Sequence, residues 1–435
     1  MARPLATAGF PVGINNTAPE ERLPTNESGG RQALREAVNV DITSDGKPRR
    51  RDGYIQVQAG QLAHSAWSDD YLPWGLFVDG HNLYVMHEDE STDVLRSDMA
   101  IGLPVSYCRI NDAVWWSNGV QSGLIRHDLE QLEWSAGQPP GAPAVSGQAG
   151  GMLPKGTYQV TATFLDATGR ESGAPLAAIT DVPDNGAINI TQIPQPPLGG
   201  RTRLYVTEGQ DGILRAAVTV PAGVTSYLLI EPAKGRTCDT LLLRPMPPGQ
   251  LVAYGNARQF VARGRELLFS PTLRYGLFDP KAGRIGFNTR VQMIAFVGDG
   301  SEAAGLYLAD AKRTYWFGGA NPANWTQRIV HSSPALPGSL AWVPGEAFGL
   351  PVKGLLPCWH SQNGRLCIGL PGGEVFLPQP REGQPDAIWD SGDSAALGYI
   401  ERSGDRRVVS SLAGASTTKF AVQDRLVVRE YRHDR

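Results

Sequence analysis

The chain has 435 residues, of which 41% are hydrophobic and 19% charged, and its formal net charge is −3 at pH 7. This length allows one large β domain or two to three ordinary domains with a real hydrophobic core. A slightly acidic chain is not expected to coat DNA, because sequence-independent duplex binding is usually driven by a surplus of basic residues.

The N-terminal stretch 1–33 predicts an extended arm. Pro19 and Pro24 disfavour helix around Glu20, Glu21 and Arg22, so these three residues are candidates for contact with a neighbouring subunit. The alternative is a terminus packed on its own domain. The first residues contain no continuous apolar segment, so we expect neither a signal peptide nor a membrane anchor, and folding in a cytoplasm.

The stretch "EAVNVDITSDGKPRRRDGYIQV" (36–57) predicts a β-hairpin. Apolar and polar residues alternate before a turn of the Asp-Gly type, and a basic strand follows it. Successive strand residues point to opposite faces, so half of the basic set Lys47, Arg49, Arg50 and Arg51 must face away from the core whatever the function. These four are candidate contacts to a subunit or to DNA, and the alternative is a merely solvated strand.

Elsewhere the pattern is short apolar and aromatic runs bounded by Gly, Pro, Asn or Asp, which is typical of strands and turns. Several runs place a polar turn before a short strand, and they recur on both sides of one long interruption. They predict an all-β, β-propeller-like domain in two parts, 34–137 and 235–435, with a β-sandwich or an irregular β assembly as the alternative. The recurring stretches are "DGHNLYVMHED" (79–89), "INDAVWWSNG" (110–119), "ARGRELLFSP" (262–271), "EAAGLYLADAKRTYWFGG" (302–319), "SQNGRLCIGLPGGEVFLP" (361–378) and "FAVQDRLVVREY" (420–431).

The interruption, 138–234, predicts an inserted sandwich. A Pro/Gly/Ala-rich stretch, 135–154, is interpreted as a linker. After it, Tyr158, Val160, Ala162 and Phe164 alternate with polar residues up to a turn at 166–169, and further short strands follow. The stretch resembles fibronectin type III domains, in which a Tyr-containing strand precedes a "D..G.ES" turn, and this resemblance implies an immunoglobulin-like fold.

No catalytic motif, metal signature or cofactor motif is present, so we expect no enzyme activity, no metal and no cofactor. The carboxylate pairs, such as Glu20-Glu21, Asp69-Asp70 and Glu88-Asp89-Glu90, sit in polar turns where solvated charge is the ordinary explanation. The four cysteines are expected to be reduced thiols packed as small apolar residues. They are Cys108, Cys238, Cys358 and Cys367.

A second class of function stays open: a carbohydrate-binding or carbohydrate-active propeller. Its sugar cleft would be lined by exposed aromatic side chains, whereas tryptophans within strand cores are ordinarily buried. The candidates are Trp74, Trp115, Trp116, Trp316 and Trp359.

The run "AVNVDITSDGKPRRRDGY" (37–54) resembles the N-terminal segment of tail proteins of tailed bacteriophages, nozzle and hub-like ring subunits that bear β-propellers. The matching residues follow the pattern N-V-x5-G-x4-R-x-G-Y and are Asn39, Val40, Gly46, Arg51, Gly53 and Tyr54. Asp52 departs from the pattern, because many such proteins have proline there.

This resemblance implies a structural virion protein, assembled in the cytoplasm of a host bacterium. Copies of the chain would form a ring, hexameric in the expected case, below the portal and adaptor and beside other tail proteins. Genomic DNA would pass through the lumen without tight binding, and the chain would not insert into a membrane. A tail-tip or baseplate protein of a long-tailed phage is an alternative that differs only in its neighbours.

Overall fold

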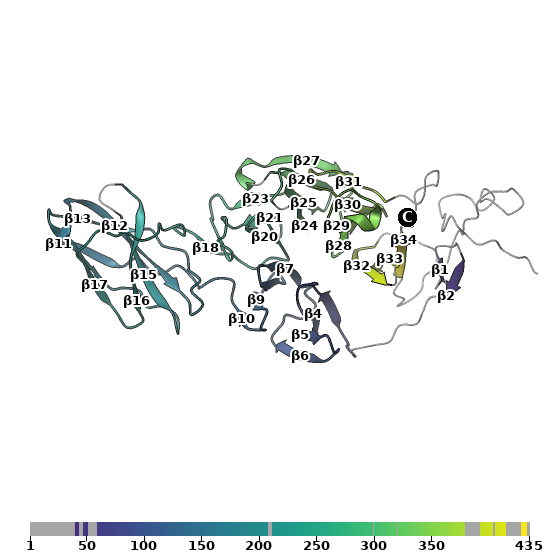
Figure 1. The fold of residues 1–435 in the computed structure, drawn as a ribbon, viewed down its shortest axis with the longest axis horizontal. Coiled ribbons are helices and arrows are strands. Elements are labelled where there is room, and N and C mark those ends of the chain that lie inside the picture. The colour runs from purple at the N-terminus through teal and green to yellow at the C-terminus, as the bar shows by residue number, and fades with distance from the viewer. Residues whose placement is uncertain are drawn as a thin grey trace, which may run out of the picture. The chain divides into compact units, whose positions relative to one another are not determined.

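The computed structural model describes residues 40–42, 47–50, 59–207, 211–298, 300–319, 321–378, 392–402, 405–414 and 428–432. The expected arm 1–33, with Glu20, Glu21 and Arg22, lies outside these residues. The chain divides into two compact units (Figure 1). Gln61–Asn288 form the middle unit, and Met1–Gly60 with Thr289–Arg435 form the terminal unit.

The middle unit contains three four-stranded antiparallel sheets of one kind, in which strands that follow one another along the chain are neighbours. A further short pair, β18 (Arg244–Pro245) with β22 (Leu277–Phe278), accompanies them. The strands of the three sheets are β3 (Ala63–Trp67), β4 (Trp74–Asp79), β5 (Asn82–His87), β6 (Thr92–Arg96); β7 (Ser106–Ile110), β8 (Ala113–Ser117), β9 (Ser122–Arg126), β10 (Gln131–Leu132); and β19 (Leu251–Gly255), β20 (Arg258–Arg263), β21 (Glu266–Phe269), β23 (Arg284–Gly286).

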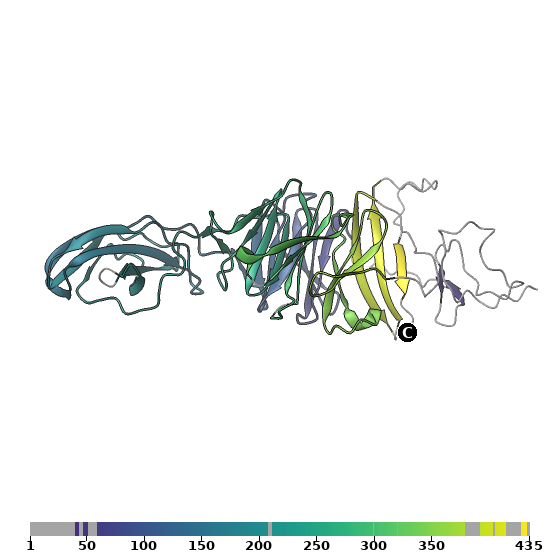
Figure 2. The same cartoon turned by 90° about the horizontal axis from the view of Figure 1, so that it is seen from above.

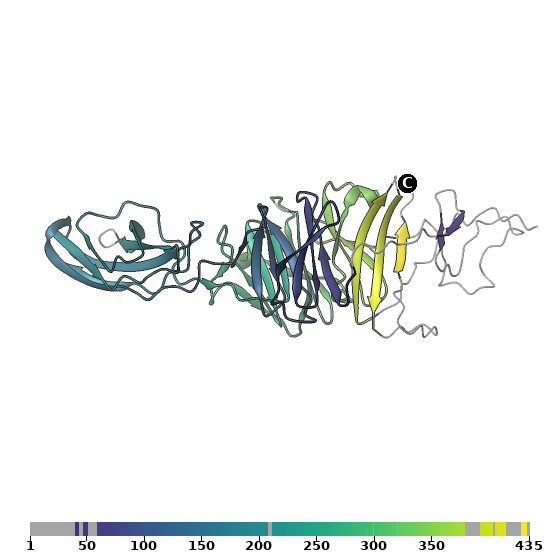
Figure 3. The same ribbon diagram turned by 90° about the horizontal axis from the view of Figure 1, so that it is seen from below.

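The terminal unit repeats the same sheet pattern twice and adds a three-stranded sheet, whose long strands β32 and β33 are yellow in Figure 3. Two short 3₁₀ helices, η3 (Pro322–Asn324) and η4 (Gly345–Phe348), lie between strands. The strands are β24 (Val291–Val297), β25 (Gly305–Asp310), β26 (Thr314–Gly318), β27 (Thr326–His331); β28 (Ala341–Pro344), β29 (Leu355–His360), β30 (Leu366–Gly369), β31 (Val375–Phe376); and β32 (Ser394–Arg402), β33 (Asp405–Ala413), β34 (Val428–Arg432).

The hydrophobic clusters lie between neighbouring sheets. One cluster of the middle unit joins Leu76 of β4 to Trp116 of β8, and another joins Trp115 of β8 to Val261 of β20. One cluster of the terminal unit includes Tyr307 of β25, Trp359 of β29 and residues of the last sheet. Small sheets that bury their faces against the next sheet are the arrangement of propeller blades. The fold is therefore all-β and propeller-like, as the recurring turn–strand pattern predicts.

Four of the recurring stretches supply the turn between the second and third strands of a sheet. "INDAVWWSNG" instead makes the turn between the first and second strands, β7 and β8, and most of "FAVQDRLVVREY" (420–431) lies outside the described residues. "DGHNLYVMHED" makes the turn between β4 and β5 and then β5, and "ARGRELLFSP" makes the turn between β20 and β21 and then β21. In "GLYLADAKRTYWFGG" the Asp310 carboxylate accepts the backbone N–H groups of Lys312 and Arg313 at 2.8 and 2.9 Å, which closes the turn between β25 and β26. An aspartate that binds the backbone ahead of it is a common turn device.

The stretch 138–234 contains a two-sheet sandwich, drawn in teal in Figure 2. A three-stranded and a four-stranded antiparallel sheet share one core that includes Tyr158, Ile188 and Leu204. Kinship with fibronectin type III domains stays a prediction. The strands are β11 (Ala144–Leu153), β14 (Gly186–Thr191), β17 (Ser226–Leu229) in one sheet and β13 (Ala178–Val182), β12 (Gly156–Leu165), β15 (Arg201–Thr207), β16 (Leu214–Pro221) in the other.

The interpretation of 135–154 as a linker is wrong for its second half. Residues 144–153 form the ten-residue strand β11, which pairs with β14. Glycines signal a flexible tether in sequence, but here they allow close backbone contact. A Cβ on Gly147 would lie 1.9 Å from the carbonyl oxygen of Asp181, and one on Gly151 would lie 2.1 Å from that of Gly186.

We expect Gly147→Ala to destabilise the middle unit by about 1–3 kcal/mol, because the new methyl group cannot fit without moving a strand backbone. Gly141→Ala is the matched control, since a Cβ there meets nothing within 4 Å and the backbone needs no positive φ. Urea unfolding of the two variants measures the difference. Equal stability of both variants would contradict the close packing of β11.

Candidate functional site

The basic hairpin predicted at the N-terminal side is present. β1 (Val40–Ile42) pairs antiparallel with β2 (Pro48–Arg50), with Asp41 opposite Arg49 and Val40 opposite Arg50. In the described part of the chain this is a two-stranded sheet. A ribbon this small has little stability of its own and depends on what packs against it.

The structure brings three of the candidate contact residues onto this ribbon. Lys47, Arg49 and Arg50 are all exposed. Arg49 and Arg50 are adjacent in β2, so they point to opposite faces, as the alternation in the sequence predicts. Arg51 lies outside the described residues. A partner that covers one face therefore meets one of these two arginines, and a partner that wraps the ribbon meets both.

The five tryptophans that could line a sugar cleft are buried. Their exposed fractions are 6% or less. Trp359 is the most enclosed, at 0% exposed, and its ring lies 5.5 Å from that of Tyr307 in the cluster of the terminal unit. Core packing accounts for these side chains, and none of the five offers a ring face to a ligand. They are Trp74, Trp115, Trp116, Trp316 and Trp359.

The carboxylate pairs serve local turns where the structure describes them. Asp69 accepts the backbone N–H of Tyr71 at 2.9 Å and the Arg109 guanidinium at 3.0 Å. Hydrogen bonds from the Ser91 hydroxyl and backbone lower the pKa of the exposed Asp89 carboxyl. The lowered pKa of Asp89 is the opposite of the raised pKa expected of a catalytic acid such as that of a glycosidase.

All four cysteines are free thiols. Cys358 and Cys367 are fully enclosed on β29 and β30, and burial raises the pKa of Cys367 to about 12 and that of Cys358 well above its usual value. Burial also raises the pKa of Cys108 and Cys238. Thiols with raised pKa values stay protonated near neutral pH, so they are poor nucleophiles and poor metal ligands.

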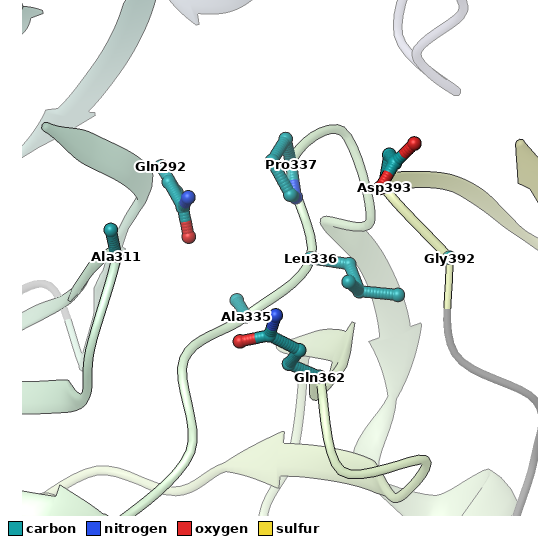
Figure 4. A pocket seen from close by; sticks show the side chains of 8 residues that line it. All are labelled: Gln292, Ala311, Ala335, Leu336, Pro337, Gln362, Gly392 and Asp393. Atoms are coloured by element: carbon teal, nitrogen blue, oxygen red, sulfur yellow. The ribbon is translucent and has the colours of Figure 1, made fainter. Parts of the chain in front are cut away.

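The described residues contain no group of three or more His, Cys, Asp or Glu side chains placed to hold a metal ion. Within the same residues, no helix has the length and apolar character needed to cross a membrane. A hollow of about 240 Å³ in the terminal unit is lined mainly by loop residues (Figure 4). Its polar side chains, Gln292, Gln362 and Asp393, can hydrogen-bond a small polar molecule.

The sandwich contains a buried ionic network that the sequence analysis does not predict. The Glu171 side chain is 4% exposed and receives hydrogen bonds from the Thr163 hydroxyl at 2.5 Å and the Tyr205 hydroxyl at 2.6 Å. Its other oxygen pairs with the guanidinium groups of Arg203, at 3.4 Å, and Arg236. The "D..G.ES" turn contains Glu171, but nothing in the sequence indicates which distant arginines meet it.

This network covers the outer face of β12. Thr161 and Thr163 are both 0% exposed, although the alternation in the sequence assigns them to a solvated face. The Thr161 hydroxyl donates to the Pro175 carbonyl at 3.0 Å, so the segment after the turn lies over the sheet. Arg236 attaches the returning chain to the same carboxylate. The network is therefore structural and holds the returning chain against this sheet.

No protein-family model matches the chain, and no curated protein is significantly similar to it in sequence. Among solved structures, it is similar to BBS1N in complex with ARL6DN, at 9% identity and a TM-score of 0.31, over 82% of this chain and 92% of that one. It is also similar to a streptogramin B lyase, at 9% identity and a TM-score of 0.29, over 80% of this chain and 90% of that one. A third similar structure is Hsv2p of Kluyveromyces lactis, at 7% identity and a TM-score of 0.28, over 83% of this chain and 94% of that one. Likenesses this distant carry no argument about function.

Glu171→Ala should lower the free energy of unfolding by about 2 kcal/mol or more, because it leaves the partly buried Arg203 and two hydroxyl groups without their acceptor. Glu130→Ala is the control, since that side chain is 45% exposed and pairs with an exposed arginine, a contact of small value. Urea denaturation of both variants provides the comparison. A loss no larger for Glu171→Ala than for Glu130→Ala would contradict the proposed role of the network.

In the native protein at pH 8 we expect Cys358 and Cys367 to be inert toward a disulfide reagent. A thiol with a pKa of about 12 is ionised in roughly one molecule in ten thousand at that pH. Residual fast reaction should belong to the partly exposed Cys238 and disappear in Cys238→Ser. All four thiols should react after denaturation, and rapid labelling of three or more in the native state would refute the packing.

Proposed function

We propose that this chain is a structural subunit of the tail of a tailed bacteriophage. Copies of it form a ring, hexameric in our proposal, below the portal and adaptor, and DNA is ejected through the ring. The observation that carries the proposal is the run 37–54. Its pattern resembles that of phage tail proteins, and part of it forms a small ribbon with exposed Arg49 and Arg50. A ribbon of this size gains stability when it docks on a neighbouring subunit.

Two further features support a mechanical role. The propeller-like sheets bury the five tryptophans named above, whereas Trp342 in the outer strand β28 is 41% exposed, and turns and edge strands are left for contact with neighbours. The net charge of −3 suits a channel, because each phosphate that a channel neutralises adds affinity and slows the passage of DNA. In this proposal the sandwich contacts other tail proteins, fibres or the host surface.

The carbohydrate-binding class has no specific observation in its favour, since the five tryptophans proposed for its cleft are buried. The tail-tip class shares every feature described here, and its proteins differ from a nozzle only in their neighbours. Electron microscopy of virions distinguishes a ring under the portal from a component of a long tail.

We expect the purified full-length chain to form a closed multimer, visible by light scattering and by negative-stain microscopy. Arg49→Glu combined with Arg50→Glu should weaken assembly about tenfold or more, since charge reversal on both faces of the ribbon repels an acidic neighbour. Arg126→Glu, in β9 and 41% exposed, is the control and should assemble as the parent does.

A chain that remains a monomer at high concentration and binds or cleaves oligosaccharides would overturn the tail assignment. Normal assembly of the double variant would leave the ring in place but remove the hairpin from its interface. Light scattering measures the oligomeric state of the parent and of the double variant. Calorimetry measures glycan binding separately.

A further inference from the structure

A group of cations lies on the sheet formed by β19, β20, β21 and β23 in the middle unit. Arg263 and Arg265 flank the turn between β20 and β21, Arg284 begins β23, and Lys281 lies in the loop before it. All four residues are exposed. We call this set the cationic turn patch.

The turn presents its two arginines from a fixed backbone. Arg263 pairs with Glu266 across the ladder, so Gly264 and Arg265 form a two-residue turn, and Gly264 has a φ of +61°. A positive φ at the first of the two positions is the type II′ geometry that favours glycine. The Gly264 N–H donates to the Gln250 side-chain oxygen at 2.9 Å, and the Phe287 N–H donates to the Arg265 carbonyl at 2.7 Å.

Positive charge exceeds negative charge on these elements. Glu266 lies 3.7 Å from Arg284, and its own side chain is 44% exposed. Asp279 accepts the backbone N–H of Lys281 at 2.8 Å. Among the described residues, Arg263, Arg265 and Lys281 make no ion pair with a carboxylate. The surplus stands out in a chain with a net charge of −3.

Protection of a sheet edge accounts for only part of this charge. Cations on an outer strand discourage pairing with other chains, and β23 is an outer strand of its sheet. That reason covers Arg284. It does not cover Arg263 and Arg265, because β20 and β21 lie inside the sheet and their turn presents no strand edge.

We propose that the cationic turn patch binds the phosphate backbone of double-stranded DNA, weakly and without sequence preference. Guanidinium groups match phosphate oxygens in a two-point geometry. Along β23 the patch runs from Arg265, beside Phe287, to Arg284 over roughly 10 Å, and Lys281 lies in the loop beyond. One strand of a duplex carries a phosphate about every 3.4 Å of axis, so about three phosphates fit this length. The patch belongs to one sheet, so its binding requires no ring.

The test uses the full-length protein and a fluorescent duplex of mixed sequence, with anisotropy measured over a range of salt concentrations. The logarithm of the binding constant should fall with the logarithm of salt at a slope of about −3. Arg263→Gln with Arg265→Gln should reduce that slope by about 2 and weaken binding at least tenfold at low salt. Lys281→Gln with Arg284→Gln tests the other end of the patch and should also reduce the slope.

Arg96→Gln with Arg126→Gln is the matched control, because both arginines lie in the same unit and pair with nearby carboxylates, Asp98 and Glu130. This variant should bind DNA as the parent does. Thermal unfolding of every variant checks that folding is unchanged.

Parent-like binding by Arg263→Gln with Arg265→Gln would overturn the proposal, and so would the absence of duplex binding by the parent protein at low salt. Polyglutamate serves as a competitor. If it displaces the duplex at an equal charge concentration, the patch fits an acidic protein surface and the assignment to DNA fails. If the protein is a monomer that binds duplex DNA through this patch, the DNA-binding proposal holds and the ring proposal fails. The two proposals are therefore tested separately.

Discussion

Burial of sheet faces against neighbouring sheets is the constraint on which this structure depends. A four-stranded antiparallel sheet of short strands has two faces and cannot cover either by itself. Here the hydrophobic clusters lie between sheets: Trp116 of β8 packs in one cluster with strands β4 and β5, while Trp115, the next residue, packs in another with β20 and β21. Adjacent residues of one strand thus belong to two different cores.

This arrangement determines where function can lie. The aromatic side chains are used in the cores between sheets, so the surface left for partners consists of turns, edge strands and the insertion. The cationic turn patch illustrates this. A type II′ turn costs the fold little, yet it fixes two arginines at the end of a sheet that is otherwise apolar inside. The basic ribbon β1–β2 is a second such surface, built from the run that resembles phage tail proteins.

The insertion is held by chemistry of a different kind. Its sheets share an apolar core, but the outer face of β12 is covered by a carboxylate with two arginines and two hydroxyl groups. A buried carboxylate is stable only when it is paired and hydrogen-bonded. The connection that leaves the sandwich meets Glu171 through Arg236, so this ion pair joins the returning chain to the sheet. The glycines of β11 serve the same purpose by permitting close contact between backbones.

The sequence by itself determined the all-β class, the recurring turn–strand units, the position of the sandwich and the basic hairpin, because alternation and turn residues act over a few neighbours in the chain. It also indicated that strand tryptophans are buried. It misread the glycines at 144–153 as a linker, and it gave no sign of the Glu171 network or of the cationic turn patch. Only the tertiary structure decided these three features. The glycine contacts and the Glu171 network join residues that are far apart in the sequence. The cationic turn patch depends on which charged side chains lack an oppositely charged partner. Neither property leaves a pattern among neighbouring residues of the chain.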